Sequence, residues 1–292
     1  MGDTDPDSFR ASFAATVAAH RLPAFVALTL SISWGVWVPL FVTVPDASIL
    51  LAVPGAFGPA LAGAVVVRCR GDGVRAWLRD CLAWRVPPRW YAAALGLPVA
   101  VGLVVAAGLL AARPDASAGR LLGVLPLFPL ALLFTTLLGG GQEEFGWRGV
   151  ALPALRERVG DLTASVAIGV VWAAWHLPLF AFDVGGYGGQ SFLLYVPLVV
   201  GLSVLFTWLH EGTGSVLLAM LFHGGWNTAP NLPAAVLGGS GRTLYLGLLA
   251  VVWLLALAVV AYHGPGRFGA GGDADAGAVE ESVARTAGEV SR

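Results

Sequence analysis

Long apolar runs, separated by short polar segments, make up most of this chain of 292 residues. A transmembrane helix needs about 20 predominantly apolar residues, because it must cross the hydrocarbon core of a bilayer. Segments of this kind lie at 23–45, 48–67, 91–112, 121–142, 162–182, 191–209, 214–230 and 244–262. The pattern therefore predicts an all-α integral membrane protein, with about eight transmembrane helices in a polytopic domain at 23–262.

The segments outside the apolar runs differ in character. Residues 1–22 lack the basic start of a signal peptide, so we expect a cytoplasmic N-terminal segment and a first apolar run that stays as a spanning helix. The loop 68–90 is rich in Arg and Trp, with Trp77 and Trp84 two helical turns apart, which predicts an amphipathic helix lying on the lipid headgroups. Residues 263–292 are rich in Gly, Ala, Asp and Glu, and predict a disordered tail.

Composition and charge support a membrane protein and indicate its orientation. The chain is 57% hydrophobic and 12% charged, whereas a soluble domain has about a quarter of its residues charged. The net charge of −1 gives no indication of a nucleic-acid partner. Eight spans put both termini on one side, and if that side is the cytoplasm it carries fourteen of the seventeen arginines. The positive-inside rule then predicts a multi-pass protein of the cell membrane with both termini cytoplasmic.

Ionisable residues at or within membrane spans usually mark a functional interior, because burying them in lipid is costly. The stretch GGGQEEFGWRG, residues 139–149, places three of them at the end of the fourth span. Glu144 and Arg148 are four residues apart, so they share a helical face and can pair. Glu143 is rotated about 100° from Glu144 and is left without that Arg. We expect the helix to continue through Arg148, with Glu143 free to serve as a general base.

Two further polar clusters lie on other predicted helices. In VWAAWHLP, Trp172 and His176 are one turn apart and share a face, so the indole can orient the imidazole. In LFHGGWNT, His223 and Asn227 are again one turn apart. The two glycines between them are poor helix formers, and we expect them to leave room for the backbone of another helix.

These clusters on the fourth, fifth and seventh predicted helices form an inventory typical of a hydrolase. A carboxylate can activate water, an imidazole can assist it, and two polar donors can stabilise the oxyanion of a tetrahedral intermediate. No candidate nucleophile stands beside a His in the pattern of a Ser–His or Cys–His pair. The attacking group is therefore expected to be water.

At these residues the sequence resembles the CPBP family of intramembrane proteases, also named the CAAX prenyl protease 2 or abortive-infection family. The resemblance covers residues 143–227 and rests on three motifs in order: EExxxR, an aromatic residue followed by xxxH, and HxxxN. The matching residues are Glu143, Glu144, Arg148, Trp172, His176, His223 and Asn227. Trp172 stands where the family usually has Phe, so the position remains aromatic.

The resemblance implies roles for these positions. Glu143 would be the catalytic base, assisted by His176, and the oxyanion hole would consist of His223 and Asn227. Glu144 and Arg148 would support the site. The resemblance also implies a site that opens toward the cytosol and a peptide or protein substrate, with or without a lipid, in contact with membrane lipids. A prenylated substrate does not follow, because bacterial relatives are linked to peptide maturation, bacteriocin immunity and secretion-related processing.

Other functions remain open on the sequence alone. No cofactor is expected, but Glu143, His176 and His223 could supply the His₂Glu ligands of a catalytic Zn²⁺, although the motif HExxH is absent. Buried Glu and His could instead form the proton relay of a transporter. A membrane protein that binds a bacteriocin without cleaving it is a third alternative.

Overall fold

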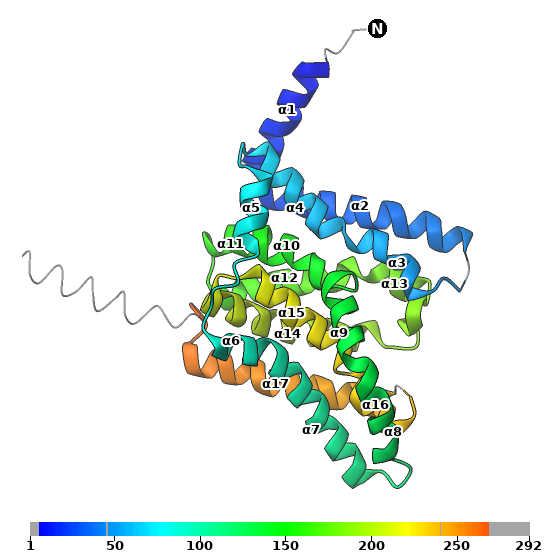
Figure 1. Ribbon diagram of the computed structural model, residues 1–292. Helices are drawn as coiled ribbons and strands as arrows, with labels where there is room; N and C mark the ends of the chain where they lie inside the picture. The colour runs from blue at the N-terminus through cyan, green and yellow to red at the C-terminus, as the bar shows by residue number, and fades with distance from the viewer. Residues whose placement is uncertain (1–5, 45, 240, 269–292) are drawn as a thin grey trace, which may run out of the picture.

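The computed structural model describes residues 6–44, 46–239 and 241–268, and every regular element within them is a helix. Seven helices are long and apolar enough to cross a membrane, which confirms an all-α multi-pass membrane protein. They lie side by side in one bundle (Figure 1). Six of them consist of α2 (Arg21–Thr43), α3 (Ile49–Ala56) with α4 (Gly58–Cys69), α6 (Pro88–Tyr91) with η1 (Ala92–Gly96) and α7 (Leu97–Ala112), α12 (Asp161–Trp175) with α13 (Leu177–Ala181), α14 (Phe192–Thr213), and α17 (Arg242–His263).

The seventh long element, residues 118–156, contains the first polar cluster and is not one continuous helix. It consists of α8 (Ala118–Val124), η2 (Leu125–Leu127), α9 (Phe128–Leu137), η3 (Gly141–Glu143), α10 (Glu144–Gly146), a π-helical turn η4 (Trp147–Ala151) and α11 (Leu152–Arg156). The helix breaks after Leu137 and resumes at Gly141, where Gly140 has a φ of 129° that only glycine readily adopts. The expectation of a helix running unbroken through Arg148 is therefore wrong.

The predicted span at 214–230 also takes a different form. It is a helix of 13 residues, α15 (Val216–Thr228), followed after a turn at Pro230 by the seven-residue α16 (Asn231–Leu237). Thirteen residues extend only about 20 Å, too short to cross a bilayer alone. A short helix suffices here because α15 is buried among α9, α14 and α7 rather than exposed to lipid.

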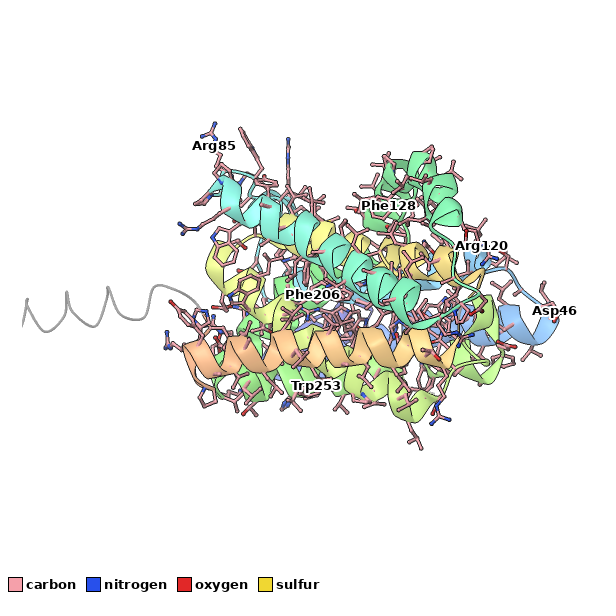
Figure 2. All side chains as sticks on the ribbon, turned by 90° about the horizontal axis from the view of Figure 1, so that it is seen from below. Asp46, Arg85, Arg120, Phe128, Phe206 and Trp253 are labelled. Atoms are coloured by element: carbon pink, nitrogen blue, oxygen red, sulfur yellow. The ribbon has the colours of Figure 1, made fainter. Side chains whose placement is uncertain are left out.

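Contacts between loops define two ends of the bundle. At the first, which we call the arginine-rich end, Arg21 pairs with Glu157, and the N–H of Asp161 donates to the carbonyl of Gly266. At the opposite end, the N–H of Ser117 donates to the carbonyl of Val236. Figure 2 shows Arg85 at one end and Arg120 and Asp46 at the other. The start of α2 and the end of α17 thus lie at the same end, and α15 and α16 together carry the chain between the two ends.

The loop 68–90 contains a shorter helix than predicted. Helix α5 (Val74–Cys81) ends before Trp84, so the two tryptophans do not share a helical face. Trp84 is 63% exposed, whereas the indole N–H of Trp77 donates to the carbonyl of Gly149, 3.3 Å away, in the π-helical turn. Pro153, four residues later, has no N–H to donate to that carbonyl. Helix α5 therefore packs against the π-helical turn through a hydrogen bond that takes the place of one within the helix.

The two ends of the chain are described in part. Helix α1 (Pro6–Ala19) precedes α2. The prediction of a disordered tail is wrong for residues 264–268, because Phe268 is 1% exposed and its N–H donates to the carboxylate of Asp161. For 269–292 that prediction lies outside the described residues.

Candidate active site

The break between α9 and η3 brings the third polar cluster against the first. A Cβ atom on Gly140 would lie only 2.4 Å from Nε2 of His223 and 2.5 Å from Nδ2 of Asn227. These two nitrogens therefore converge on the backbone of the break. Asn227 also donates to the carbonyl of Gly139 at 2.6 Å. Its side chain is exposed, so the break is accessible from outside the bundle at this point.

The close approach of α15 to α9 depends on the glycine that follows His223. A Cβ on Gly224 would meet the backbone nitrogen of Thr136 at 2.9 Å. The hydroxyl of Thr135 donates to the carbonyl of Gly224 at 3.0 Å and lies 2.8 Å from the hydroxyl of Thr228. The prediction that these glycines admit a neighbouring backbone is confirmed.

Glu143 is held by two tryptophans. Its Oε2 accepts a hydrogen bond from Nε1 of Trp172 at 2.8 Å and a longer one from Nε1 of Trp147 at 3.4 Å. The residue is only 4% exposed. Both donors are neutral, so the hydrogen bonds that Glu143 accepts in the described structure do not come from a charged group.

The neighbouring carboxylate, Glu144, has quite different partners. Its Oε2 lies 2.9 Å from Nη1 of Arg148, as the four-residue spacing predicts, and both side chains are fully buried. Its Oε1 lies 2.7 Å from Nδ1 of His223, a contact that the sequence did not indicate. Arg148 also donates to the hydroxyl of Ser203 at 3.2 Å and stacks over the ring of Phe206. Glu144 thus orients His223 and is itself neutralised by Arg148.

His176 follows the last residue of α12 and joins the site through Trp172. Its Nδ1 lies 2.8 Å from the carbonyl of Trp172, the same residue whose indole binds Glu143. The rings of Tyr187 and Tyr195 pack on the imidazole, at 5.9 and 5.3 Å between centroids. Burial raises the pKa of Tyr187, which lies in the loop after α13, to about 12, so its hydroxyl stays protonated at neutral pH.

The structure therefore connects all seven predicted residues in one region, in which every one except Asn227 is buried, and it adds others. Trp147 could have been noticed, since it lies one helical turn after Glu143. Gln142 could not: its Oε1 accepts from the N–H of Gly140 at 3.0 Å and its Nε2 donates to the carbonyl of Leu138 at 3.2 Å, bonds that depend on the break itself.

The residues considered for zinc are not arranged as a metal site. Among the described residues, no group of three or more His, Cys, Asp or Glu is placed to hold one ion. Nδ1 of His176 faces a carbonyl and Nδ1 of His223 faces Glu144. In each ring Nε2 is the nitrogen that these two contacts leave unoccupied.

Comparison with known proteins agrees with the position of this site. Residues 125–229 match the family described as type II CAAX prenyl endopeptidase Rce1-like. Over this segment the chain is similar to that family. The matched segment contains all three motif clusters, from Glu143 to Asn227.

A curated relative of this chain is CAAX prenyl protease 2 of Methanococcus maripaludis, which is 32% identical over 103 residues. The alignment covers 32% of this chain and 36% of the relative. The chain thus spans about a third of that relative's length.

Proposed function

We propose that this protein is a member of the CPBP family and an intramembrane endopeptidase in which Glu143 activates water for attack on a peptide bond. The observation that carries the proposal is the separation of the two adjacent carboxylates. Glu144 is committed to direct contacts with Arg148 and His223, whereas the hydrogen bonds that Glu143 accepts among the described residues come from indole N–H groups. A general base needs a carboxylate that is positioned but not tied up in a direct ion pair.

The proposed reaction assigns a step to each group. Glu143 takes a proton from water as the water oxygen attacks the peptide carbonyl, forming a tetrahedral intermediate. His223 donates from Nδ1 to Glu144, and its Nε2, when it carries a proton, donates to the oxyanion beside the second N–H of Asn227. The C–N bond then breaks, and the proton held by Glu143 passes to the leaving amine. His176, whose Nδ1 binds a carbonyl, has Nε2 available to orient the water.

The substrate we propose is a peptide or a protein segment, with or without an attached lipid. The relative in Methanococcus maripaludis is named a prenyl protease, and this name extends to the present chain only as a proposal. We also propose that the arginine-rich end faces the cytoplasm, which places both termini there and follows the positive-inside rule. No metal is proposed for the reaction.

Cleavage by the purified full chain in liposomes tests this function. Against a panel of lipidated and unlipidated peptides, Glu143→Gln should lower kcat/KM by at least about 100-fold, because general-base catalysis typically contributes a factor of 10²–10⁴. The matched control is Glu157→Gln, an exposed carboxylate at the arginine-rich end, which should cleave like the parent.

Two results would reject the proposed mechanism. Cleavage that survives Glu143→Gln would show that another group is the base. Cleavage abolished by a chelator and restored by Zn²⁺ would show a metal-dependent reaction instead. If the parent cleaves none of the peptides while transporting protons or binding a bacteriocin, the endopeptidase assignment itself fails.

A further inference from the structure

Helices α8 and α9 with the turn η2, residues 118–137, form an arm that touches the bundle at two places. At the opposite end of the bundle, the N–H of Ser117 and Nη1 of Arg120 both donate to the carbonyl of Val236. Deeper in the bundle, Thr135 bonds to α15 at Gly224 and Thr228. The remainder of the arm is largely exposed.

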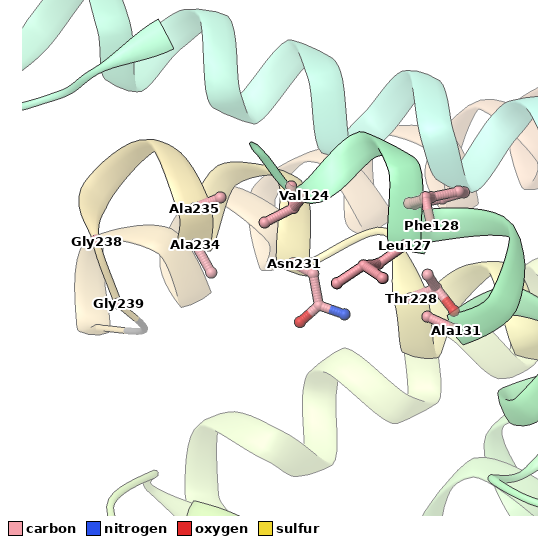
Figure 3. Close-up of a pocket in the computed structure, with 10 residues that line it drawn as sticks. All are labelled: Val124, Leu127, Phe128, Ala131, Thr228, Asn231, Ala234, Ala235, Gly238 and Gly239. Atoms are coloured by element: carbon pink, nitrogen blue, oxygen red, sulfur yellow. The ribbon is translucent and has the colours of Figure 1, made fainter. Parts of the chain in front are cut away.

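Between these two attachments lies a cavity of about 460 Å³. Figure 3 shows it between the arm and α15–α16, with the side chain of Asn231 pointing into it. The lining residues are Val124, Leu127, Phe128, Ala131, Thr228, Asn231, Ala234, Ala235, Gly238 and Gly239. The lining is mostly apolar, and a cavity of this kind beside a helix exposed to lipid will be filled by hydrocarbon rather than by water.

The two ends of the cavity differ in polarity. One end, at Gly238 and Gly239, lies at the loops of the opposite end of the bundle, where Nη1 of Arg120 lies 3.0 Å from the position of a Cβ on Gly238. The other end, at Ala131 and Thr228, lies deeper in the bundle. A charged guanidinium at the membrane surface and an apolar cavity below it match the charged headgroup and the hydrocarbon chain of a lipid.

Arg120 has the capacity to bind an anion. Its side chain is exposed, and its Nη1 makes only long bonds to two carbonyls, of Asp115 at 3.4 Å and Val236 at 3.3 Å. Its Nε and Nη2 make no hydrogen bond among the described residues. The carboxylate of Asp115, which interacts electrostatically with Arg120, is hydrogen-bonded to Arg113 at 3.0 Å and not to Arg120. A guanidinium with two free donor groups matches a phosphate well.

We propose that this cavity binds one anionic glycerophospholipid, with an acyl chain between the arm and α16 and the phosphate on Arg120. The lipid replaces side-chain packing that the arm lacks between its two attachments. It therefore holds in place the helix that leads to the break at Gly140. The proposal does not depend on proteolytic activity.

Native mass spectrometry of the full chain tests this. The protein is released from nanodiscs containing equal amounts of phosphatidylglycerol and phosphatidylcholine, and the lipids that remain bound are counted. The parent should retain one phosphatidylglycerol. Arg120→Gln should lower that occupancy about tenfold, since a hydrogen bond to a charged group is worth ~1.5–3 kcal/mol. Ala131→Phe, which fills the cavity, should lose both lipids.

Arg242→Gln is the control, because it removes the same charge from an exposed position at the same end of the bundle, outside the cavity lining. The proposal would be overturned if Arg120→Gln and Arg242→Gln retained equal amounts of bound phosphatidylglycerol. It would also be overturned if Ala131→Phe retained as much bound lipid as the unmodified protein. Displacement of the phospholipid by a farnesylated peptide would also overturn it, by assigning the cavity to the substrate. Should Ala131→Phe fail to fold, the exposed Arg120→Gln still decides the question.

Discussion

Glu143 and Glu144 are adjacent in sequence yet have unrelated environments. A rotation of about 100° per residue points Glu144 toward Arg148 and His223 and points Glu143 toward the indoles of Trp147 and Trp172. The same chemical group therefore serves as part of a buried ion-pair network at one position and as the proposed base at the next. The functional difference between them comes from their partners.

Gly140 supplies a residue-scale test of the proposed oxyanion site. In Gly140→Ala, the added methyl group would lie within 2.5 Å of both His223 and Asn227, and the φ of 129° would be strained. We expect kcat/KM to fall by at least about 100-fold, the usual loss when one oxyanion donor is displaced. Gly108→Ala is the control, because a Cβ there meets nothing within 4 Å.

Parent-like cleavage by Gly140→Ala would contradict a site at the convergence of these two nitrogens. A variant that unfolds is identified by its thermal transition in detergent. In that case Asn227→Ala, which adds no atoms, should show the same loss of kcat/KM with an unchanged transition.

At the scale of elements, irregular backbone lies on both sides of the two glutamates. The break at Gly139–Gly140 admits the donors of α15, and the turn Trp147–Ala151, which contains Arg148, follows α10 (Glu144–Gly146). Irregular backbone at membrane depth occurs where it is buried in protein or lines a cavity, and π-turns are frequent at functional sites. Helix α5 covers this irregular segment from the arginine-rich side.

Trp77 is expected to stabilise the π-helical turn. Trp77→Phe keeps an aromatic ring but loses the donor to the carbonyl of Gly149, so the free energy of unfolding should fall by about 1 kcal/mol, with a further loss from the smaller ring. Denaturant titration in detergent micelles measures this. Trp84→Phe, at an exposed position, should leave the unfolding free energy almost unchanged; equal effects of the two changes would refute the assignment.

At the scale of the whole molecule, the described part of the chain passes between the two ends of the bundle eight times, although seven of its elements have the length of a spanning helix. The pass made by α15 and α16 can be short because other helices surround α15. It is also the pass that carries His223 and Asn227. Helix α15, which is too short to be recognised as a spanning helix by its length, therefore supplies two of the four proposed catalytic residues.

Cysteine labelling in intact cells tests this topology and its orientation. In a background with Cys69 and Cys81 replaced by Ser, a membrane-impermeant maleimide should label Asp115→Cys and Gly239→Cys, at the opposite end. It should label Asp72→Cys and Arg267→Cys, at the arginine-rich end, only after the cells are permeabilised. Opposite accessibility of Asp72→Cys and Arg267→Cys would contradict an even number of passes, and a reversed pattern overall would contradict cytoplasmic termini.

Sequence by itself determined the class of the protein, most of its spans and the pairing of Glu144 with Arg148. These follow from local rules: apolar length for the spans and the four-residue helical period for the pair. The same rules predicted the wrong continuation through Arg148 and a tail disordered from residue 263. They failed there because the break at Gly140 and the anchoring of Phe268 depend on contacts with distant residues.

Only the tertiary structure decided which side chains meet. The bond of His223 to Glu144 joins residues 79 positions apart, and that of Trp172 to Glu143 joins residues 29 apart. No periodicity within one helix encodes such distances. They are set by how α9, α12 and α15 pack, and that packing depends on Gly140 and Gly224, whose missing side chains allow the backbones to approach. Helical period thus assigned each residue to a face, and packing decided what each face contacts.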